Sequence, residues 1–157
     1  MLPTTPITIT TATPADIPTI KSLVAAAFTK YIHRIGKPPA PMLASYDDLH
    51  GVFVLTAVES NHTILGSITL SEDPDSDAVK INNLVVDPAA QGRGYGRLLV
   101  EFAEGRARES GRGVVALATN VKMYENLGLY KKLGFVEVGR GMEEGYERVF
   151  LRKNVDS

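Results

Sequence analysis

The residues most able to do chemistry in this chain are three alternating glycines with two arginines among them, at positions 92–97. An apolar run at 84–86 precedes them and is typical of the end of a buried strand, whereas a helical pattern follows them. Glycine permits a positive φ and lets a ligand approach bare N–H groups. A helix that begins at about Gly94 would turn its unpaired N–H groups and positive dipole end toward this turn. The spacing therefore predicts a phosphate or pyrophosphate site, to which Arg93 and Arg97 add charge.

The glycine spacing separates three phosphate-binding motifs. Counted from Gly92, a dinucleotide fingerprint needs its third glycine where Arg97 stands, and a Walker loop needs a Gly-Lys-Ser/Thr triplet that the chain lacks. Gln91, Gly94 and Gly96 instead form Gln-x-x-Gly-x-Gly. This pattern resembles the acyl-CoA signature of the GNAT superfamily of N-acyltransferases, whose loop wraps the pyrophosphate of coenzyme A. A glycine-rich turn that only links strand to helix is the alternative.

A second motif lies at 126–135, Asn-Leu-Gly-Leu-Tyr-Lys-Lys-Leu-Gly-Phe. It is similar to the GNAT ending Leu-Tyr-x-x-Leu-Gly-Phe. Gly134 is predicted to end a helix as a left-handed C-cap, and Lys131 and Lys132 suit the negative end of that helix. Two signatures in the right order, separated by a helix and a strand, identify the chain as a member of the superfamily.

The resemblance implies a mixed α/β fold, with a central, mostly antiparallel sheet of about seven strands flanked by about four helices. In that fold the strand at 78–86 splays from the strand at 113–119, and the pantetheine arm of acetyl-CoA lies in the opening. The implied acetyl-CoA-binding residues are Leu84, Val85, Val86, Gln91, Gly92, Arg93, Gly94, Tyr95, Gly96, Arg97 and Asn126.

The resemblance makes Tyr130 the catalytic residue. A phenol with a pKa of about 10 stays protonated at neutral pH and can donate to a thiolate whose conjugate acid has a pKa of about 8.5. A core aromatic with a satisfied hydroxyl is the alternative role. The family's commoner pattern has an asparagine where this chain has Met123. Binding of the pantetheine arm by a side-chain amide would therefore fall to Asn126 or Asn120.

The general base is left open by the sequence. Many family members carry a glutamate where this chain has Asn82, followed by Asn83, and neither amide can accept a proton. A water chain, His33 or Glu72 are the candidates.

Acceptor specificity is assigned to residues 31–42, where three prolines stiffen the chain. Tyr31 could stack on a substrate, and Arg34 or Lys37 could pair with a carboxylate. His33 is a further candidate for substrate binding. A surface loop with solvated charges is the alternative. Peptide N-termini, polyamines, amino acids and antibiotics all remain open as acceptors.

The composition excludes several classes of protein. The 157 residues suit one domain spanning 1–157, and a net charge of −1 argues against nucleic-acid binding. Without cysteine the chain can form no disulfide, and its three histidines lack metal-ligand spacing, so we expect no metal. No apolar run is long enough to span a membrane and the start does not resemble a signal peptide, so a cytoplasmic monomer or homodimer without membrane partners is expected.

Periodicity and turn residues predict the remaining elements. A helix starts after Thr13, residues 36–41 are irregular, and the helix from Gly94 to Ser110 turns Glu101 and Glu104 outward. The other elements expected are a short helix at 42–50, strands at 52–59, 63–71, 78–86 and 114–117, a helix at 122–133, and a hairpin of 135–139 with 146–152.

These patterns predict an N-acetyltransferase that transfers an acetyl group from acetyl-CoA, its co-substrate, to a primary amine of a small molecule or peptide. Because the chain has no cysteine, direct attack in a ternary complex is favoured over a cysteine-linked acyl enzyme. A GNAT-like module that binds acyl-CoA without turnover is the alternative, since Asn82 stands where a carboxylate is expected. A nicotinamide dinucleotide oxidoreductase is disfavoured by the glycine spacing.

Overall fold

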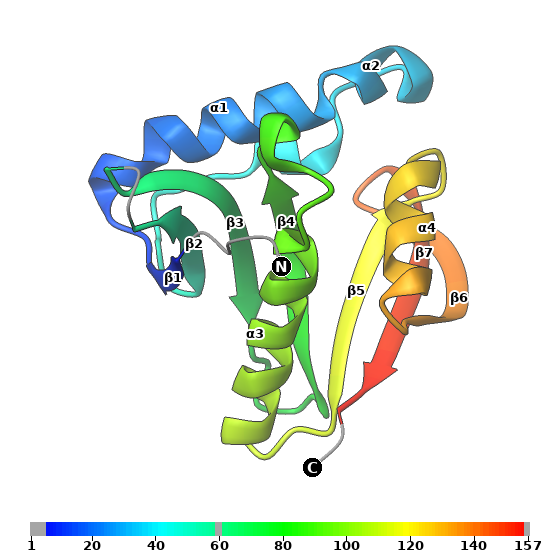
Figure 1. Ribbon diagram of the computed structural model, residues 1–157. Helices are drawn as coiled ribbons and strands as arrows, with labels where there is room; N and C mark the ends of the chain where they lie inside the picture. Colours follow the sequence, from blue (N-terminus) through cyan, green and yellow to red (C-terminus); the bar gives the residue numbers. More distant parts are fainter. Residues whose placement is uncertain (1–5, 59–60, 156–157) are drawn as a thin grey trace.

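The computed structural model describes residues 6–58 and 61–155, which form one mixed sheet with helices on both faces (Figure 1). In chain order the elements are β1 (Ile7–Thr11), η1 (Pro14–Asp16), α1 (Ile17–Phe28), α2 (Lys30–Ile35), η2 (Ala40–Leu43), β2 (Val52–Ala57), β3 (Thr63–Ser71), β4 (Ala78–Val86), η3 (Pro88–Ala90), α3 (Tyr95–Glu109), β5 (Val114–Asn120), α4 (Tyr124–Lys132), β6 (Val136–Glu143) and β7 (Tyr146–Asn154). The elements labelled η are short 3-10 helices.

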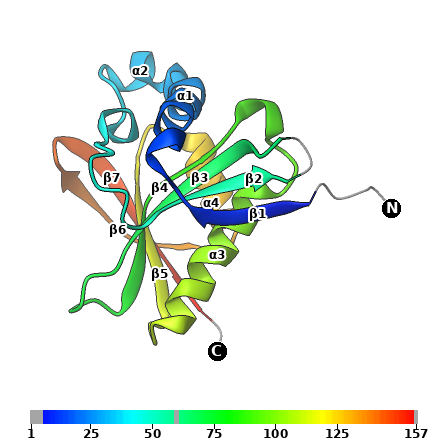
Figure 2. The same ribbon diagram turned by 90° about the vertical axis from the view of Figure 1, so that its left-hand side faces the viewer.

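The sheet has seven strands in the order β1-β2-β3-β4-β5-β7-β6. Neighbouring strands are antiparallel except β4 and β5, which run parallel and are joined through α3. Helices α1 and α2 lie over one face of the sheet, and α3 lies against the other (Figure 2). The mixed fold with about seven strands and four helices, expected from the sequence, is confirmed.

Two apolar cores hold these layers together. The first lies between the sheet and α3, with Leu99, Val100 and Ala103 facing the strands, and it extends to Tyr130 of α4. The second lies under α1 and contains Tyr31 and Tyr46. Each core is built from the apolar face of an amphipathic helix, as the 3.6-residue periodicity predicts.

Several local predictions are confirmed. The backbone N–H of Thr13 donates to Asp16 at 2.8 Å, so the helix start has the expected capping box. At the end of α4, Gly134 has a φ of 100°, and Phe135 N–H donates to the Tyr130 carbonyl at 3.1 Å. With Gly134 N–H donating to Lys131, this is a Schellman motif.

Three local predictions are wrong. The short helix expected at 42–50 is absent: only the end of the 3-10 turn η2 reaches this segment, and irregular chain follows it. The chain from Lys30 to Ile35, expected to begin a loop, is the helix α2. Glu104 faces inward and is buried, because Lys153 of β7 neutralises it at 2.6 Å.

Candidate active site

The opening between β4 and β5 is the feature that organises the candidate site (Figure 1). The two strands pair only from Ala78↔Val114 to Ile81↔Leu117. Beyond Ile81, β4 continues to Val86 alongside β3 but without a partner in β5. Backbone N–H and C=O groups on this edge of β4, which includes Leu84, Val85 and Val86, therefore have no partner in β5.

The turn at 91–97, which we call the phosphate loop, leads from this edge into α3. Gly92 and Gly94 have φ values of 83° and 86°, and Gly94 is the N-cap of α3. A methyl group at either glycine would meet no protein atom within 4 Å, so open space lies in front of the helix N-terminus. The buried Tyr95 anchors the first turn of α3, whereas the side chains of Arg93 and Arg97 are exposed. Exposed cations and free N–H groups around open space suit a phosphate.

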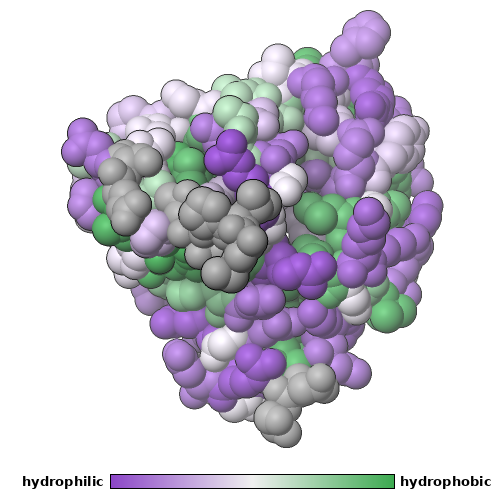
Figure 3. Space-filling view, viewed as in Figure 1, coloured by the Kyte–Doolittle hydropathy of each residue, from purple (hydrophilic) through white to green (hydrophobic). Residues whose placement is uncertain are grey.

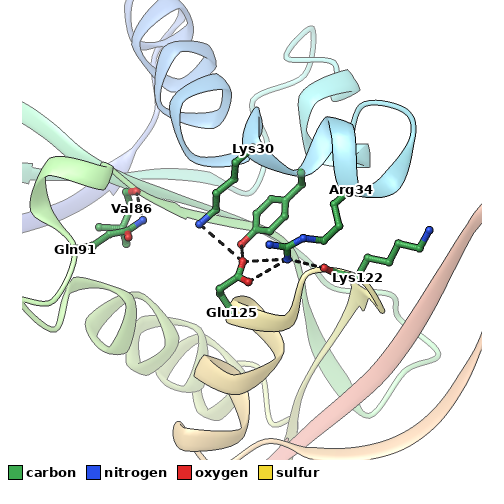
Figure 4. A network of polar contacts seen from close by, with 7 residues as sticks. Lys30, Arg34, Val86, Gln91, Lys122 and Glu125 are labelled. Atoms are coloured by element: carbon green, nitrogen blue, oxygen red, sulfur yellow. Dashed lines mark hydrogen bonds and ion pairs between the residues drawn. The ribbon is translucent and has the colours of Figure 1, made fainter.

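The phosphate loop borders the opening between the strands. A methyl group at Gly96 would contact Leu129 of α4 at 3.9 Å and Val86 of β4 at 4.0 Å. The Gln91 side-chain amide lies 3.5 Å from the Val86 carbonyl (Figure 4). Viewed from the side of α3 and α4, the mainly hydrophilic surface exposes a hydrophobic area right of its centre (Figure 3). A ligand held at the phosphate loop would therefore extend over apolar surface toward β4.

A cavity of about 500 Å³, which we call the main cavity, occupies the opening. Of the predicted site residues, Leu84, Asn126 and Tyr130 line it, as do both residues of the bulged β4 segment, Asn82 and Asn83. The phosphate loop is not part of its described lining. The predicted site residues are thus divided between the phosphate loop, β4 and the main cavity.

Tyr130 lies at the wall between the first core and the main cavity. Its ring is buried and packs edge-on against Phe135, with centroids 5.6 Å apart. Burial raises the pKa of Tyr130 well above that of a free phenol. The hydroxyl therefore keeps its proton at neutral pH and can act as a donor.

A bulge in β4 shapes the opposite wall. Thr69 pairs with Asn83 and Leu70 with Ile81, so Asn82 has no counterpart on β3. A bulge bends its strand and re-aims the side chains beside it. Here two neutral amides follow one another along the cavity wall, and neither can serve as a base.

Two of the residues assigned to acceptor binding are used to join α2 to α4 (Figure 4). The buried Tyr31 donates its hydroxyl to Glu125 at 2.6 Å, and Arg34 donates to Glu125 at 3.0 Å. Arg34 also donates to the Lys122 carbonyl at 2.9 Å, and Lys30 lies 3.8 Å from Glu125. The Tyr31 hydroxyl, Arg34 and Lys30 lower the pKa of Glu125, whereas burial and the hydrogen bond to Glu125 raise that of Tyr31.

Neither Tyr31 nor Arg34 is among the described residues that line the main cavity, and the exposed His33 lies outside that lining as well. Glu72, the other candidate base, is exposed beyond the end of β3 and is likewise outside it. Asn120, the alternative to Asn126, lines the cavity, as does Met123 at the position of the family's asparagine.

The far end of the main cavity is closed by contacts that the sequence did not predict. Lys37 donates to the Gly145 carbonyl at 2.8 Å, and Tyr146 donates its hydroxyl to the Pro38 carbonyl. These bonds tie the proline-rich segment to the β6–β7 turn, where Glu144 has a φ of 53° and Gly145 one of 83°. The cavity residues missed by the sequence include Tyr46, Asp48, His50, Glu143, Glu144, Tyr146 and Arg148.

These residues could not have been found from the sequence, because their signal is long-range contact rather than local spacing. Only the β6–β7 turn leaves a trace, since Gly141 and Gly145 mark a hairpin there. Within the described ranges, no cluster of three or more His, Cys, Asp or Glu could hold a metal ion. Over the same ranges, no helix combines the length and apolarity needed to cross a membrane.

The model of the acetyltransferase (GNAT) family matches residues 19–135, which include the phosphate loop, the opening and α4. This chain belongs to the GNAT acetyltransferase family. The GNAT relative N-alpha-acetyltransferase RimI of Mycobacterium tuberculosis (strain ATCC 25618 / H37Rv) is 32% identical over 156 residues, covering 93% of this chain and 87% of RimI.

Other similarities to GNAT proteins are more partial or more distant. A mycothiol acetyltransferase of Nocardia farcinica (strain IFM 10152) is 36% identical over 95 residues, which are 58% of this chain. The chain spans only 31% of that relative's length. The solved structure of Ard1 from Thermoplasma volcanium has a TM-score of 0.72 at 19% identity, covering 96% of this chain and 99% of Ard1, and so shares the fold.

Proposed function

We propose that this GNAT protein is an acetyl-CoA-dependent N-acetyltransferase that acetylates a primary amine of a small molecule or peptide by direct attack in a ternary complex. The observation that carries the proposal is the opening between β4 and β5. It is bordered on one side by a helix N-terminus suited to a pyrophosphate and holds a chamber whose lining includes Tyr130. Family membership supports the same reaction class.

The chain's groups suit acetyl-CoA in order along the opening. The N–H groups at the start of α3, with Arg93 and Arg97, would bind the pyrophosphate. The unpaired edge of β4 from Leu84 to Val86 would bind the amide groups of the pantetheine arm, and Asn126 would contact its distal part. Gln91 would exchange its long hydrogen bond to Val86 for the bound arm or remain beside it.

In the transfer, the amine nitrogen attacks the thioester carbonyl carbon. The new C–N bond forms, the C–S bond breaks, and the nitrogen loses one proton. A backbone N–H of β4 would stabilise the oxyanion, and Tyr130 would donate its proton to the departing thiolate. The Tyr130 hydroxyl is protonated before this step, as any phenol is at neutral pH, and burial raises its pKa further.

The amine proton would leave through water toward the carboxylates of the main cavity. Asp48, Glu143 and Glu144 line it. Glu143 is already paired with Arg148 at 2.8 Å, so Asp48 and Glu144 are the better candidates to receive a proton. This route replaces His33 and Glu72 in the proposal, because both lie away from the chamber.

A second candidate function has one observation in its favour. The residue at the β4 bulge is Asn82, which cannot remove a proton. A protein that binds acyl-CoA without turnover would need no base there. This sensor function predicts binding of acetyl-CoA without thiol release.

The test measures free thiol released from acetyl-CoA with purified protein and a panel of amines. The panel contains a hexapeptide with a free amino terminus, spermidine, glutamate and kanamycin, and mass spectrometry identifies each product. We expect acetyl-CoA-dependent thiol release and an acetylated amine with at least one member. Tight acetyl-CoA binding without release for any amine would support the sensor function, and no binding at all would contradict both functions.

A further inference from the structure

Tyr46 is a side chain of the main cavity whose polar group has no use in the fold. It lies between η2 and β2, its ring packs in the second core, and it is only 8% exposed. Its hydroxyl is fully enclosed, and no group in the described residues completes a hydrogen bond with it. An enclosed hydroxyl without a partner is unfavourable, so its presence calls for an explanation.

A second enclosed polar atom without a partner, on Arg112, is explained by the other hydrogen bonds of its side chain. Nε of Arg112 is also enclosed without a partner, but the same guanidinium donates through Nη1 to carbonyls of residues 73–78. The Arg112 guanidinium therefore stabilises the loop before β4. The hydroxyl of Tyr46 has no such second atom, and its residue lines the main cavity.

The neighbour of this hydroxyl is the side-chain amide of Asn83. Burial raises the pKa of Tyr46, and the nearby Asn83 side chain partly lowers it again, so the two polar groups lie close together. Asn83 is half-buried, lines the same cavity and follows the β4 bulge. Its amide thus lies between an enclosed phenol and the open chamber.

An asparagine amide has two ends of nearly equal shape and opposite hydrogen-bonding character. When its NH₂ group faces Tyr46, its oxygen faces the chamber. An amine that attacks a carbonyl directs its lone pair at carbon, so its N–H groups need acceptors. An amide oxygen supplies one without holding the amine as a charged ammonium, which a carboxylate would favour.

We propose that Tyr46 is a positioning residue, which holds the Asn83 amide so that its oxygen accepts a hydrogen bond from the nucleophilic nitrogen of the acceptor. This inference rests on the proposed acetyltransferase function. It names Asn83 as the acceptor-binding residue and Tyr46 as the residue that orients it.

The test uses Tyr46→Phe, Asn83→Ala, the double variant, and Tyr124→Phe as the matched control with an exposed ring. The acceptor is the panel amine that the parent acetylates fastest. Each single variant should lose about tenfold in kcat/KM for the amine, as expected for one oriented hydrogen bond. The double variant should match Asn83→Ala, because Tyr46 acts through that side chain.

Two further readouts separate positioning from a structural role. The KM for acetyl-CoA should stay at the parent value, and the Tm of Tyr46→Phe should stay close to that of the parent, because phenylalanine keeps the ring that packs in the second core. A Tyr46→Phe enzyme with parental kcat/KM for the amine would overturn the proposal. So would losses that multiply in the double variant, or a lowered Tm together with weaker acetyl-CoA binding. An inactive parent would instead contradict the proposed function itself.

Discussion

The phosphate loop and the main cavity both border the opening between β4 and β5, but they are built in different ways. The loop is one continuous run, residues 91–97, and its main functional groups belong to the backbone. The cavity takes side chains from segments as far apart in sequence as Tyr46, Asn83, Tyr130 and Arg148. A backbone site needs only glycines at the right spacing, whereas a side-chain site depends on how distant segments pack.

This difference bears on how each region would respond to changes in the sequence. A turn that acts through N–H groups can bind the same phosphate in many proteins, whatever surrounds it. The shape of the main cavity depends instead on contacts between distant segments, such as those of Lys37 and Tyr146 that join the proline-rich segment to the β6–β7 turn. The comparison therefore predicts that variants of the two regions affect different steps of the reaction.

The largest expected effect is on turnover, at Tyr130. Tyr130→Phe removes one hydroxyl and almost no volume, so the ring should still pack against Phe135. Loss of a positioned general acid should lower kcat by about 10²–10⁴-fold. Steady-state thiol release measures kcat, and calorimetry should give a parental acetyl-CoA Kd. Tyr124→Phe, on the same helix, is the control.

A Tyr130→Phe enzyme that kept more than half of the parental turnover, with chemistry rate-limiting, would remove this residue from the mechanism. It would also weaken the comparison between the two regions, because Tyr130 would then contribute only packing to the wall of the main cavity.

The arginines of the phosphate loop should affect the binding of coenzyme A rather than turnover. Arg93→Ala and Arg97→Ala should each weaken coenzyme A binding by about 1.5–3 kcal/mol if the contact is desolvated. A pantetheine fragment without the phosphates should bind to variants and parent alike, since it lacks the groups that the arginines contact. Equal losses for coenzyme A and the fragment would mean that the arginines act through the fold.

The smallest effect is expected at the α2–α4 contact, which lies beside the opening. Glu125→Gln keeps the shape of the side chain but removes the charge that Tyr31, Arg34 and Lys30 share. Because Glu125 is about half exposed, we expect a loss of only about 1 kcal/mol at pH 7. Thermal unfolding measures it, with the exposed Glu101→Gln as control.

The pH dependence of this loss follows from the lowered pKa of Glu125, whose chief cause is the Tyr31 hydrogen bond. A group with a lowered folded-state pKa stabilises the protein above its unfolded pKa, and this stabilisation disappears as pH falls through the folded value. The difference in Tm between parent and Glu125→Gln should therefore shrink from pH 7 to pH 3. A difference that stayed constant would show that the charge of Glu125 does not stabilise this contact.

Much of the fold could be predicted because its signals are local. Alternating apolar residues marked β3 and β4, Thr13 and Asp16 marked a helix start, and Gly134 marked a helix end. The phosphate loop was visible for the same reason.

The main cavity was less predictable, because its determinants are not local. The helix α2 forms where the sequence suggested a stiff acceptor-binding loop, and its Tyr31 and Arg34 contact α4 rather than the chamber. The partners of these bonds are about 90 residues apart. Tyr46 gave no sequence signal, since only the folded chain encloses its hydroxyl beside Asn83.

The central claim is that the N-terminus of α3 binds the pyrophosphate of acetyl-CoA. Gly94→Val tests it most directly, because a side chain there would fill open space in front of the free N–H groups. Valine is strained at a φ of 86°, so the control is Gly111→Val, at the other end of α3 with a φ of 72° and equally open space.

Calorimetric titration of acetyl-CoA into parent, Gly94→Val and Gly111→Val compares the two ends of one helix under similar backbone strain. We predict that parent and Gly111→Val bind with the same Kd, whereas Gly94→Val, still folded by circular dichroism, shows no measurable binding. A Gly94→Val protein that bound acetyl-CoA with the parental Kd would contradict the claim.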